Sequence, residues 1–274
     1  DWFAALEIWL LFAASLVTFI AVVGRGLILG EKNNINLMLF RDINFSASAL
    51  LMMLVGSVFL SLLVLAPQIF IDMMGWEVVT AGLIIGSYGL AGISGAILSS
   101  HLAAAIGLRR VVILACVLLG ISWYLFSRID LNIGPGDVVL PGMLLEFSMM
   151  LVFPLLSAQA FSGLPPRLRD EGAGLFNLAK SLGFSLGTTF VVTLVYRGNQ
   201  ANWNILGGQL NPVNPGYNQY LQAAGLDDMS AQAGAELCQL LLSQSSMVTM
   251  VHTMQLLAIV SICALPLVLL LRTR

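Results

Sequence analysis

The sequence predicts an all-α membrane protein with seven transmembrane helices. Its composition supports this, because 58% of the residues are hydrophobic and only 9% are charged, whereas soluble domains carry charges at about 25% of positions. Its long apolar stretches support it too, since a hydrocarbon core about 30 Å thick requires roughly 20 apolar residues in a helix. Membrane barrels instead use alternating strands of ~10 residues. Lipid offers no partner for backbone polar groups, so a helical bundle is expected.

The seven candidate spans differ in length and in the charges they contain. Phe45–Ile71 contains no charged residue, and the first span is broken only by Arg25 near its end. The fifth span contains one acid, Glu146, and the sixth contains one base, Lys180. The fourth is the shortest but falls within the usual range. In chain order the candidates are Ile8–Leu29, Phe45–Ile71, Val78–Ser100, Val111–Ser127, Val138–Pro166, Gly172–Tyr196 and Ser245–Leu271.

The basic residues predict how these spans are oriented. Cytoplasmic loops of membrane proteins carry an excess of Lys and Arg. The loops after spans one, three and five, together with the C-terminus, contain nine basic residues, whereas the opposite side contains two, Arg128 and Arg197. We therefore expect the N-terminus outside and the C-terminus inside. The nine are Arg25, Lys32, Arg41, Arg109, Arg110, Arg167, Arg169, Arg272 and Arg274.

One connection, the polar segment 198–244, is much longer than the others. Asn211-Pro212 and Asn214-Pro215 are turn signals within it. We interpret it either as a loop that packs on the rim of the bundle or as a docking surface for a periplasmic or extracellular partner. Its later part, Ser230–Leu242, has helical spacing and places near one face Ala231, Ala235, Leu237 and Leu241.

Glycines within the spans predict close packing between helices. Small residues let helix backbones approach one another in lipid. Gly82 and Gly86 form one G-x-x-x-G pair in the third span, and Gly183 and Gly187 form another in the sixth.

Glu146 is a strong candidate for a functional residue, because charged groups inside a span are costly and are functional by default. It lies eight residues into its span, about 12 Å below the outer surface at ~1.5 Å per residue. A carboxyl group at that depth is suited to bind a proton or a cationic substrate. The alternative is a hydrogen-bonded carboxyl group that fastens its span to a neighbouring helix.

Three further residues complete the candidate site. Lys180 is suited to snorkelling toward the cytoplasmic interface, to a structural hydrogen bond, or to pairing with Glu146. Asn177 lies three residues before it. Histidine carries protons near neutral pH, although a single membrane histidine such as His252 is more often a packed polar residue. The candidate substrate- or proton-binding residues are therefore Glu146, Lys180, Asn177 and His252.

Enzyme, cofactor and metal chemistry are not predicted. The chain contains no H-E-x-x-H, no P-loop and no Cys/His cluster with metal spacing. Its three cysteines are spread without a disulfide framework, and its net charge of −2 gives no indication of a nucleic-acid partner. Gly183–Gly187 matches G-x-S-x-G but falls in mid-span. Gly92-Ile-Ser94-Gly95 resembles the G-x-S-G of rhomboid proteases, with His252 as a base, which leaves an intramembrane serine protease as a remote alternative.

A series of motifs runs along almost the whole chain. They are Asn36–Phe45, Leu65–Gln68 with Gly75 and Ala81–Leu83, Gly107–Arg110, and Ser162–Pro166 with Gly174–Asn177, Lys180–Gly183 and Ser185–Gly187. In order and spacing these motifs resemble the EmrB/QacA branch of the major facilitator superfamily, and the long outer segment resembles the EmrB subgroup in particular. Two positions depart from the family, which usually has a small residue in place of Glu146 and an Arg in place of Lys180.

The resemblance implies that this chain is the back part of a fourteen-helix transporter. Residues 1–44 would form an extra transmembrane helix with a cytoplasmic linker. Residues 45–274 would form the C-terminal six-helix half, with the long outer loop at 198–244. Spans two to seven would form two inverted three-helix repeats. Spans two, three, five and six would line the cavity, and spans four and seven would lie outside.

The function implied by the resemblance is proton-coupled multidrug efflux by alternating access in a bacterial inner membrane. Hydrophobic or cationic small-molecule drugs and protons would be the substrates. The implied partners are the missing N-terminal half of the same chain, a periplasmic membrane-fusion adaptor and an outer-membrane channel. Export of a non-drug metabolite by a transporter of the same superfamily is left open.

The predicted orientation is tested by placing single cysteines on opposite sides of the membrane. A cysteine at Asn214 should react with an impermeant maleimide added to intact cells, whereas a cysteine at Arg169 should react only after the membrane is made permeable, because basic loops stay in the cytoplasm. Cells that express a cysteine-free version provide the background. The reverse labelling pattern would contradict the orientation.

Overall fold

The computed structural model describes residues 6–29, 37–211, 213–224 and 231–271, and within them it is entirely helical apart from turns. Its longer helices are α1 (Leu6–Leu29), α2 (Ile43–Pro67), α3 (Val78–Ile106), α4 (Leu108–Phe126), α5 (Val139–Ser162), α6 (Arg169–Gly207), α7 (Pro215–Ala224) and α8 (Ala231–Cys263). Short helical turns complete the chain: η3 (Leu37–Arg41), η4 (Gln68–Met73), η5 (Pro135–Val138), η6 (Pro166–Leu168) and α9 (Leu265–Val268).

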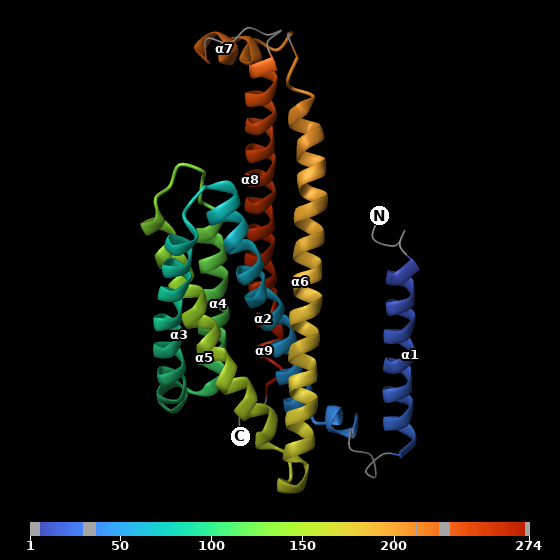
Figure 1. Cartoon of the computed structure of the whole chain (residues 1–274). Coiled ribbons are helices and arrows are strands. Elements are labelled where there is room, and N and C mark those ends of the chain that lie inside the picture. Colours follow the sequence, from blue (N-terminus) through green and yellow to red (C-terminus); the bar gives the residue numbers. More distant parts are fainter. Residues whose placement is uncertain (1–5, 30–36, 212, 225–230, 272–274) are drawn as a thin grey trace.

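Within the described residues, six helical segments are long and apolar enough to cross a membrane, one fewer than the seven spans predicted. They overlap predicted spans two to seven and differ from them in their bounds: Ile43–Met73, Val78–Ile106, Leu108–Phe126, Pro135–Ser162, Pro166–Gly207 and Gly234–Val268. The first predicted span corresponds to α1, whose apolar part, Leu6–Ala21, is shorter. Helix α1 stands apart from the other helices (Figure 1) and most of its described side chains are exposed. The first crossing therefore stays a prediction.

Local signals explain where several helices begin and end. The carboxylate of Asp42 accepts a hydrogen bond from the backbone N–H of Phe45, at 2.9 Å, and so caps the start of α2. Gly107 separates α3 from α4 with a φ of 90°, a conformation that glycine adopts without steric cost. The guanidinium group of Arg109 donates to the carbonyl oxygen of Leu269 at 3.2 Å and ties this turn to the end of the last helix.

The six spans form two groups of three, α2–α3–α4 and α5–α6–α8, with matching contacts between them. Helix α3 packs along α5 in the same way that α2 packs along α6. The first helices of the two groups, α2 and α5, contact each other, and so do the third helices, α4 and α8. This pairing is the one that two equivalent three-helix repeats produce.

Glycines make the two longest contacts possible. On α6, added Cβ atoms at Gly183 and Gly187 would overlap the backbone of Met53 and Ser57 on α2. On α3, an added Cβ at Gly95 would meet the backbone of α5. The predicted close packing is therefore confirmed for the Gly183–Gly187 pair. Gly82 and Gly86, by contrast, have no neighbouring atom within 4 Å at their Cβ positions, so this predicted pair makes no close helix contact here.

Helices α6 and α8 extend far beyond the bundle, so the segment predicted as a loop is mostly helical. Figure 1 shows both helices continuing upward, with α7 lying across their ends. Helix α6 continues to Gly207 because its polar residues after Gly198 include no proline. The amide group of Asn202 donates to the hydroxyl oxygen of Thr249 at 2.9 Å, which joins the two helices.

The outer end of this extension has a small apolar cluster of its own. Leu221 of α7 and Leu237 of α8 are buried together, with Tyr217 packed against them. Leu241 is buried as well. Of the four residues predicted near one face of this helix, Leu237 and Leu241 are thus buried and Ala235 is exposed, whereas the side chain of Ala231 lies outside the described part of the structure. Residues 225–230 lie outside the described residues.

Replacing Gly187 with Leu should destabilise the bundle, because the new side chain has no space against Ser57. Overpacking of this kind costs about 1–3 kcal/mol. The measurements are the abundance of the protein in membranes and its unfolding temperature after purification. The matched control is Gly86→Leu, which extends into open space and should leave both unchanged. Equal effects of the two substitutions would contradict the packing described above.

Candidate functional site

One face of α5 is partly open and combines a carboxyl group with polarizable and aromatic side chains. Met143, Glu146, Met150 and Phe153 are half-buried, whereas the residues between them are largely buried. Their spacing of three and four residues places them on one side of the helix. This face therefore presents a single acid among methionine and phenylalanine side chains within the membrane span.

Glu146 lies where α5 crosses a glycine of α3. An added Cβ at Gly92 would be 2.9 Å from Cγ of Glu146 and 3.3 Å from its Oε1. Only glycine at position 92 leaves room for the carboxylate there. Among the described residues the structure gives Glu146 no hydrogen-bond or ion-pair partner. This disfavours the interpretation of Glu146 as a hydrogen-bonded brace between helices.

Lys180 of α6 contacts the same face of α5. Its Nζ lies 5.0 Å from the centroid of the Phe153 ring, which is a cation–π contact. Phe153 is seven residues beyond Glu146, about 10 Å along the helix axis. The described residues contain no ion pair between Glu146 and Lys180, so the pairing considered for them is not present. Asn177 lies one turn before Lys180 on α6 and is exposed.

His252 lies elsewhere, in a small cavity of about 170 Å³ between α6 and α8. The cavity is partly polar, because Asn202, Thr249 and Thr253 line it together with His252. The hydroxyl group of Thr249 donates to the carbonyl oxygen of Ser245 at 2.8 Å. The structure therefore groups Glu146 and Lys180 on the α5 face and separates His252 from them.

The geometry gives no support to the protease alternative. The hydroxyl group of Ser94 donates to the carbonyl oxygen of Ala91 in its own helix, at 2.7 Å. No hydrogen bond joins Ser94 and His252 in the described parts of the chain. Within the same parts, no group of three or more His, Cys, Asp and Glu side chains is placed to hold a metal ion.

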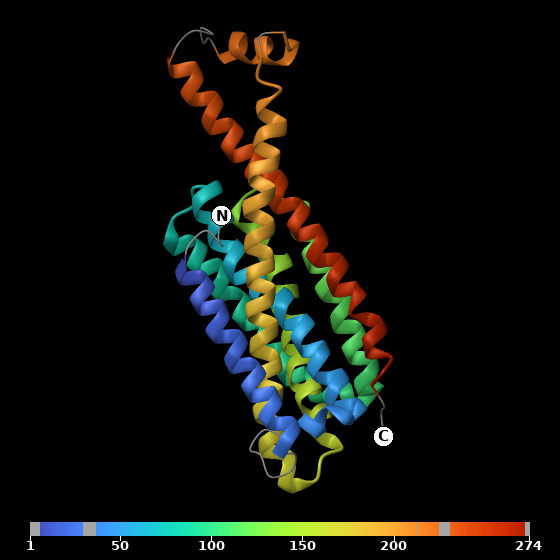
Figure 2. The same ribbon diagram turned by 90° about the vertical axis from the view of Figure 1, so that its right-hand side faces the viewer.

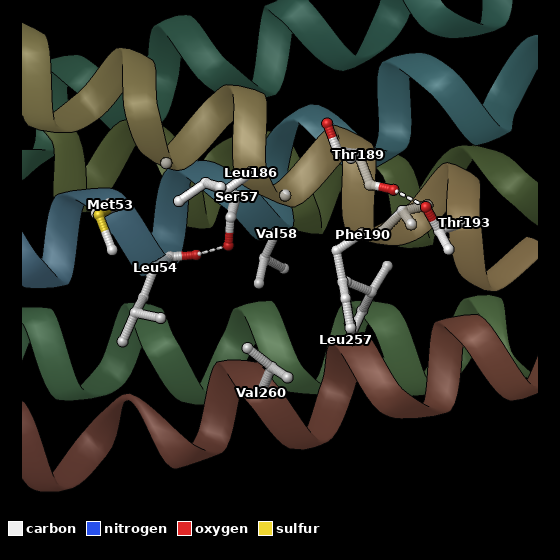
Figure 3. Close-up of a pocket in the computed structure, with 13 residues that line it drawn as sticks. Met53, Leu54, Ser57, Val58, Leu186, Thr189, Phe190, Thr193, Leu257 and Val260 are labelled. Carbon is white, nitrogen blue, oxygen red and sulfur yellow. Dashed lines mark hydrogen bonds between the residues drawn. The ribbon is translucent and has the colours of Figure 1, made fainter. Parts of the chain in front are cut away.

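A larger cavity of about 540 Å³ lies between α2, α6 and α8 (Figure 3). Leu54 and Val58 of α2 face Val260 of α8 across it, and Phe190 of α6 lies beside Leu257 of α8. The lining is almost entirely apolar. The complete lining is Met53, Leu54, Ser57, Val58, Gly183, Leu186, Gly187, Thr189, Phe190, Val191, Thr193, Leu257 and Val260.

Two contributions to these sites were not identified from the sequence. Phe153 is one, because a phenylalanine in an apolar span carries no signal until the helix that faces it is known. The cavity between α2, α6 and α8 is the other, since its lining residues come from three separate spans. A usable signal was the spacing of Met143, Glu146, Met150 and Phe153, which places two polarizable side chains and one aromatic ring on the helix face of the single acid.

Comparison with known protein families gives a match over most of the bundle. The model of the Major Facilitator Superfamily matches residues 8–188. This range includes α2, α3, α4 and α5, together with the part of α6 that contains Lys180.

Comparison with curated proteins gives several bacterial relatives at low identity. The multidrug export protein EmrB of Escherichia coli (strain K12) is 24% identical over 251 residues, which is 91% of this chain and 49% of the relative. EmrB of Haemophilus influenzae is 26% identical over 248 residues, 89% of this chain and 48% of the relative. The lincomycin resistance protein LmrB of Listeria innocua serovar 6a is 21% identical over 171 residues. The chain spans about half the length of the EmrB relatives.

Proposed function

Because this chain belongs to the major facilitator superfamily, a family of membrane transporters and not of enzymes, we propose that it forms the C-terminal half of a proton-coupled multidrug exporter. The exporter works by alternating access, in which two halves rock about a site near the middle of the membrane. The other half is the N-terminal part of a longer chain, in keeping with the relatives that this chain covers by about half.

The arrangement of the helices supports this division. Residues 45–274 include the six helices that pair as two groups of three. Residues 1–44 include α1, which stands apart from them (Figure 1) and serves as the extra linking helix. In the proposed transporter α2, α3, α5 and α6 line the cavity, and α4 and α8 lie behind them.

The partly open face of α5 is the observation that carries the proposed function. Glu146 is half-buried, has no described partner, and has Met143, Met150 and Phe153 on its side of the helix. Such a surface suits a hydrophobic cation, since the carboxylate supplies charge and the sulfur and aromatic groups supply adaptable contacts. Lys180 lies over the ring of Phe153 at the inner end of this face. Asn177 offers a neutral hydrogen-bonding group beside it.

The outer extension of α6, α7 and α8 is the proposed docking surface for a periplasmic adaptor. The length of the extension and the hydrogen-bonded turn at its end support this role. The side-chain oxygen of Asn211 accepts from the backbone N–H groups of Val213 and Asn214, at 3.0 and 3.1 Å. This turn holds Val213 out in solvent, where it is 88% exposed. The protein would then act in the inner membrane of a bacterium, with an outer-membrane channel completing the route.

Glu146→Gln tests the substrate site, because glutamine keeps the size and hydrogen bonding of the side chain but removes its charge. In cells that rely on the full-length transporter, resistance to cationic drugs should fall by about tenfold, equivalent to about 1.4 kcal/mol of binding. Resistance to neutral compounds should stay nearly unchanged. The matched control is Glu77→Gln, an exposed acid just before α3, which should have no effect.

Other outcomes of this experiment have distinct meanings. An equal loss for all compounds at normal protein levels would assign Glu146 to proton coupling. Unchanged resistance to every compound would remove Glu146 from the site and favour a transporter of a different, non-drug metabolite. Expression of the protein in membranes is measured in parallel, because a brace between helices would be affected more by Glu146→Leu than by Glu146→Gln.

Shortening the outer extension tests the proposed docking surface. Gly207 lies opposite Leu241, 3.6 Å from its side chain at the Cβ position, so residues 208–240 can be replaced by a short Gly-Ser linker at this level. The shortened full-length transporter should insert into membranes normally but no longer co-purify with its adaptor. Val213→Asp, which changes only the exposed tip, should weaken co-purification less. Undiminished co-purification of the shortened protein would contradict the docking surface and favour the interpretation that the segment only packs on the rim of the bundle.

A further inference from the structure

Two hollows that differ in polarity lie next to one another along the α6–α8 seam, the line along which helices α6 and α8 meet. The apolar cavity of about 540 Å³ includes Thr193 and Leu257. The partly polar cavity of about 170 Å³, called here the His252 pocket, includes Leu194 and Leu256, the adjacent residues of the same two helices. One hollow therefore follows directly on the other toward the outer extension.

The His252 pocket lies at the level of the membrane surface. Gly187 of α6 contacts Ser57 of α2, and this contact fixes the relative height of the two helices. Asn202 lies as far beyond Gly187 as Asp72 lies beyond Ser57. Asp72 is the exposed, charged residue that follows the apolar run of α2. Asn202 and the His252 pocket are thus level with the end of a span, and the apolar cavity lies at hydrocarbon depth.

The apolar cavity offers almost no free hydrogen-bonding groups. The hydroxyl group of Ser57 donates to the carbonyl oxygen of Leu54 at 2.7 Å, and that of Thr193 donates to the carbonyl oxygen of Thr189 at 2.7 Å (Figure 3). Both donors are therefore used within their own helices, and the third hydroxyl group of the lining, that of Thr189, points away from the cavity (Figure 3). The lining therefore suits a hydrocarbon chain and gives a polar group no hydrogen-bond partner.

We propose that the α6–α8 seam binds a phospholipid of the leaflet nearer α7. Its head group occupies the His252 pocket, and one acyl chain fills the apolar cavity. The hydroxyl groups of Thr249 and Thr253 donate to carbonyl oxygens of their own helix, so the phosphate is bound by the imidazole of His252 and by the amide hydrogen of Asn202 that is not used on Thr249. The distance suits such a molecule. Gly198 in the pocket and Gly187 in the cavity are separated by about 16 Å of helix, and half of a hydrocarbon core is about 15 Å thick.

The lipid site is separate from the proposed drug site. Lys180 of α6 faces α5, where it contacts Phe153, whereas the cavity is lined by the side of α6 that meets α2 and α8. Helices α6 and α8 cross closely at Gly198 and Thr249 and diverge below that point (Figure 2). The acyl chain fills the wedge between them, so the lipid supports the geometry of the bundle without being its cargo.

Photolabelling tests this proposal. The full-length transporter is placed in nanodiscs that contain a phosphatidylethanolamine analogue with a diazirine midway along one acyl chain. After irradiation, mass spectrometry should place labels near Phe190 and Val260 about tenfold above those at Ile97, an exposed residue of α3. Val260→Trp fills the cavity and should abolish the excess. Its neighbour Ile259, 61% exposed and outside the cavity, provides the matched control Ile259→Trp, which should leave it intact.

Two further arms identify the ligand. His252→Ala should lower the labelling of the seam by the phospholipid analogue about threefold. A diazirine-bearing alkane without a head group should show no excess at the seam. Labelling no higher at Val260 than at Ile97 in the unmodified protein would overturn the proposal. Labelling of the seam by the alkane as strong as that by the phospholipid analogue would overturn it as well, and so would unchanged labelling after His252→Ala. Either result would mean that the head group does not bind in the His252 pocket.

Discussion

The close approach of α6 to α2, and of α3 to α5, is the contact on which the rest of the bundle depends. In lipid no hydrophobic force drives one helix onto another, so association relies on packing at short range. Gly183 and Gly187 allow the short approach of α6 to α2, and Gly92 and Gly95 allow that of α3 to α5. The room that Gly92 leaves is also the room in which Glu146 lies. The same constraint that holds the helices together therefore positions the acid.

The two contacts share a further detail, an aromatic ring seated on a glycine of the partner helix. Phe184 of α6 lies against Gly56 of α2, and Tyr88 of α3 lies against Gly142 of α5. The hydroxyl group of Tyr88 also donates to the carbonyl oxygen of Val138 at 3.1 Å. Each ring fills the space that the missing side chain leaves. The equivalence of the two contacts explains why the two groups of three helices take up matching arrangements.

Much of the fold could be predicted from the sequence because hydropathy acts over whole segments. Spans two to seven correspond to long apolar helices, since a run such as Phe45–Ile71 has no alternative in lipid. The extension of α6 beyond Tyr196 could not be predicted in this way, because Asn and Gln are compatible with both helix and loop. The contacts of Gly82 and Gly86 could not be predicted from the sequence either. A G-x-x-x-G pair indicates that a close contact is possible, but only the neighbouring helix decides which glycines make it.

The candidate site was predictable to the extent that charge is rare in a span. Glu146 and Lys180 stand out for that reason, and the structure places them on one face of the bundle. Their separation by two helical turns, and the insertion of Phe153 beside Lys180, depend on the relative height of α5 and α6. No local pattern encodes that height. His252 drew attention as a titratable group, yet its surroundings, a pocket shared with Asn202, come from a crossing of α6 and α8.

The continuity of α6 has a mechanical consequence. One unbroken helix runs from Lys180 within the bundle to Gly207 in the outer extension, a length of about 40 Å. A stiff rod of that length acts as a lever, so a tilt of 10° about the level of Lys180 displaces the far end by about 7 Å. Helix α8 is fastened to the rod through Asn202 and Thr249 and moves with it. Small rearrangements of the bundle around Lys180 are thereby converted into displacements of several Å at the far end of the extension.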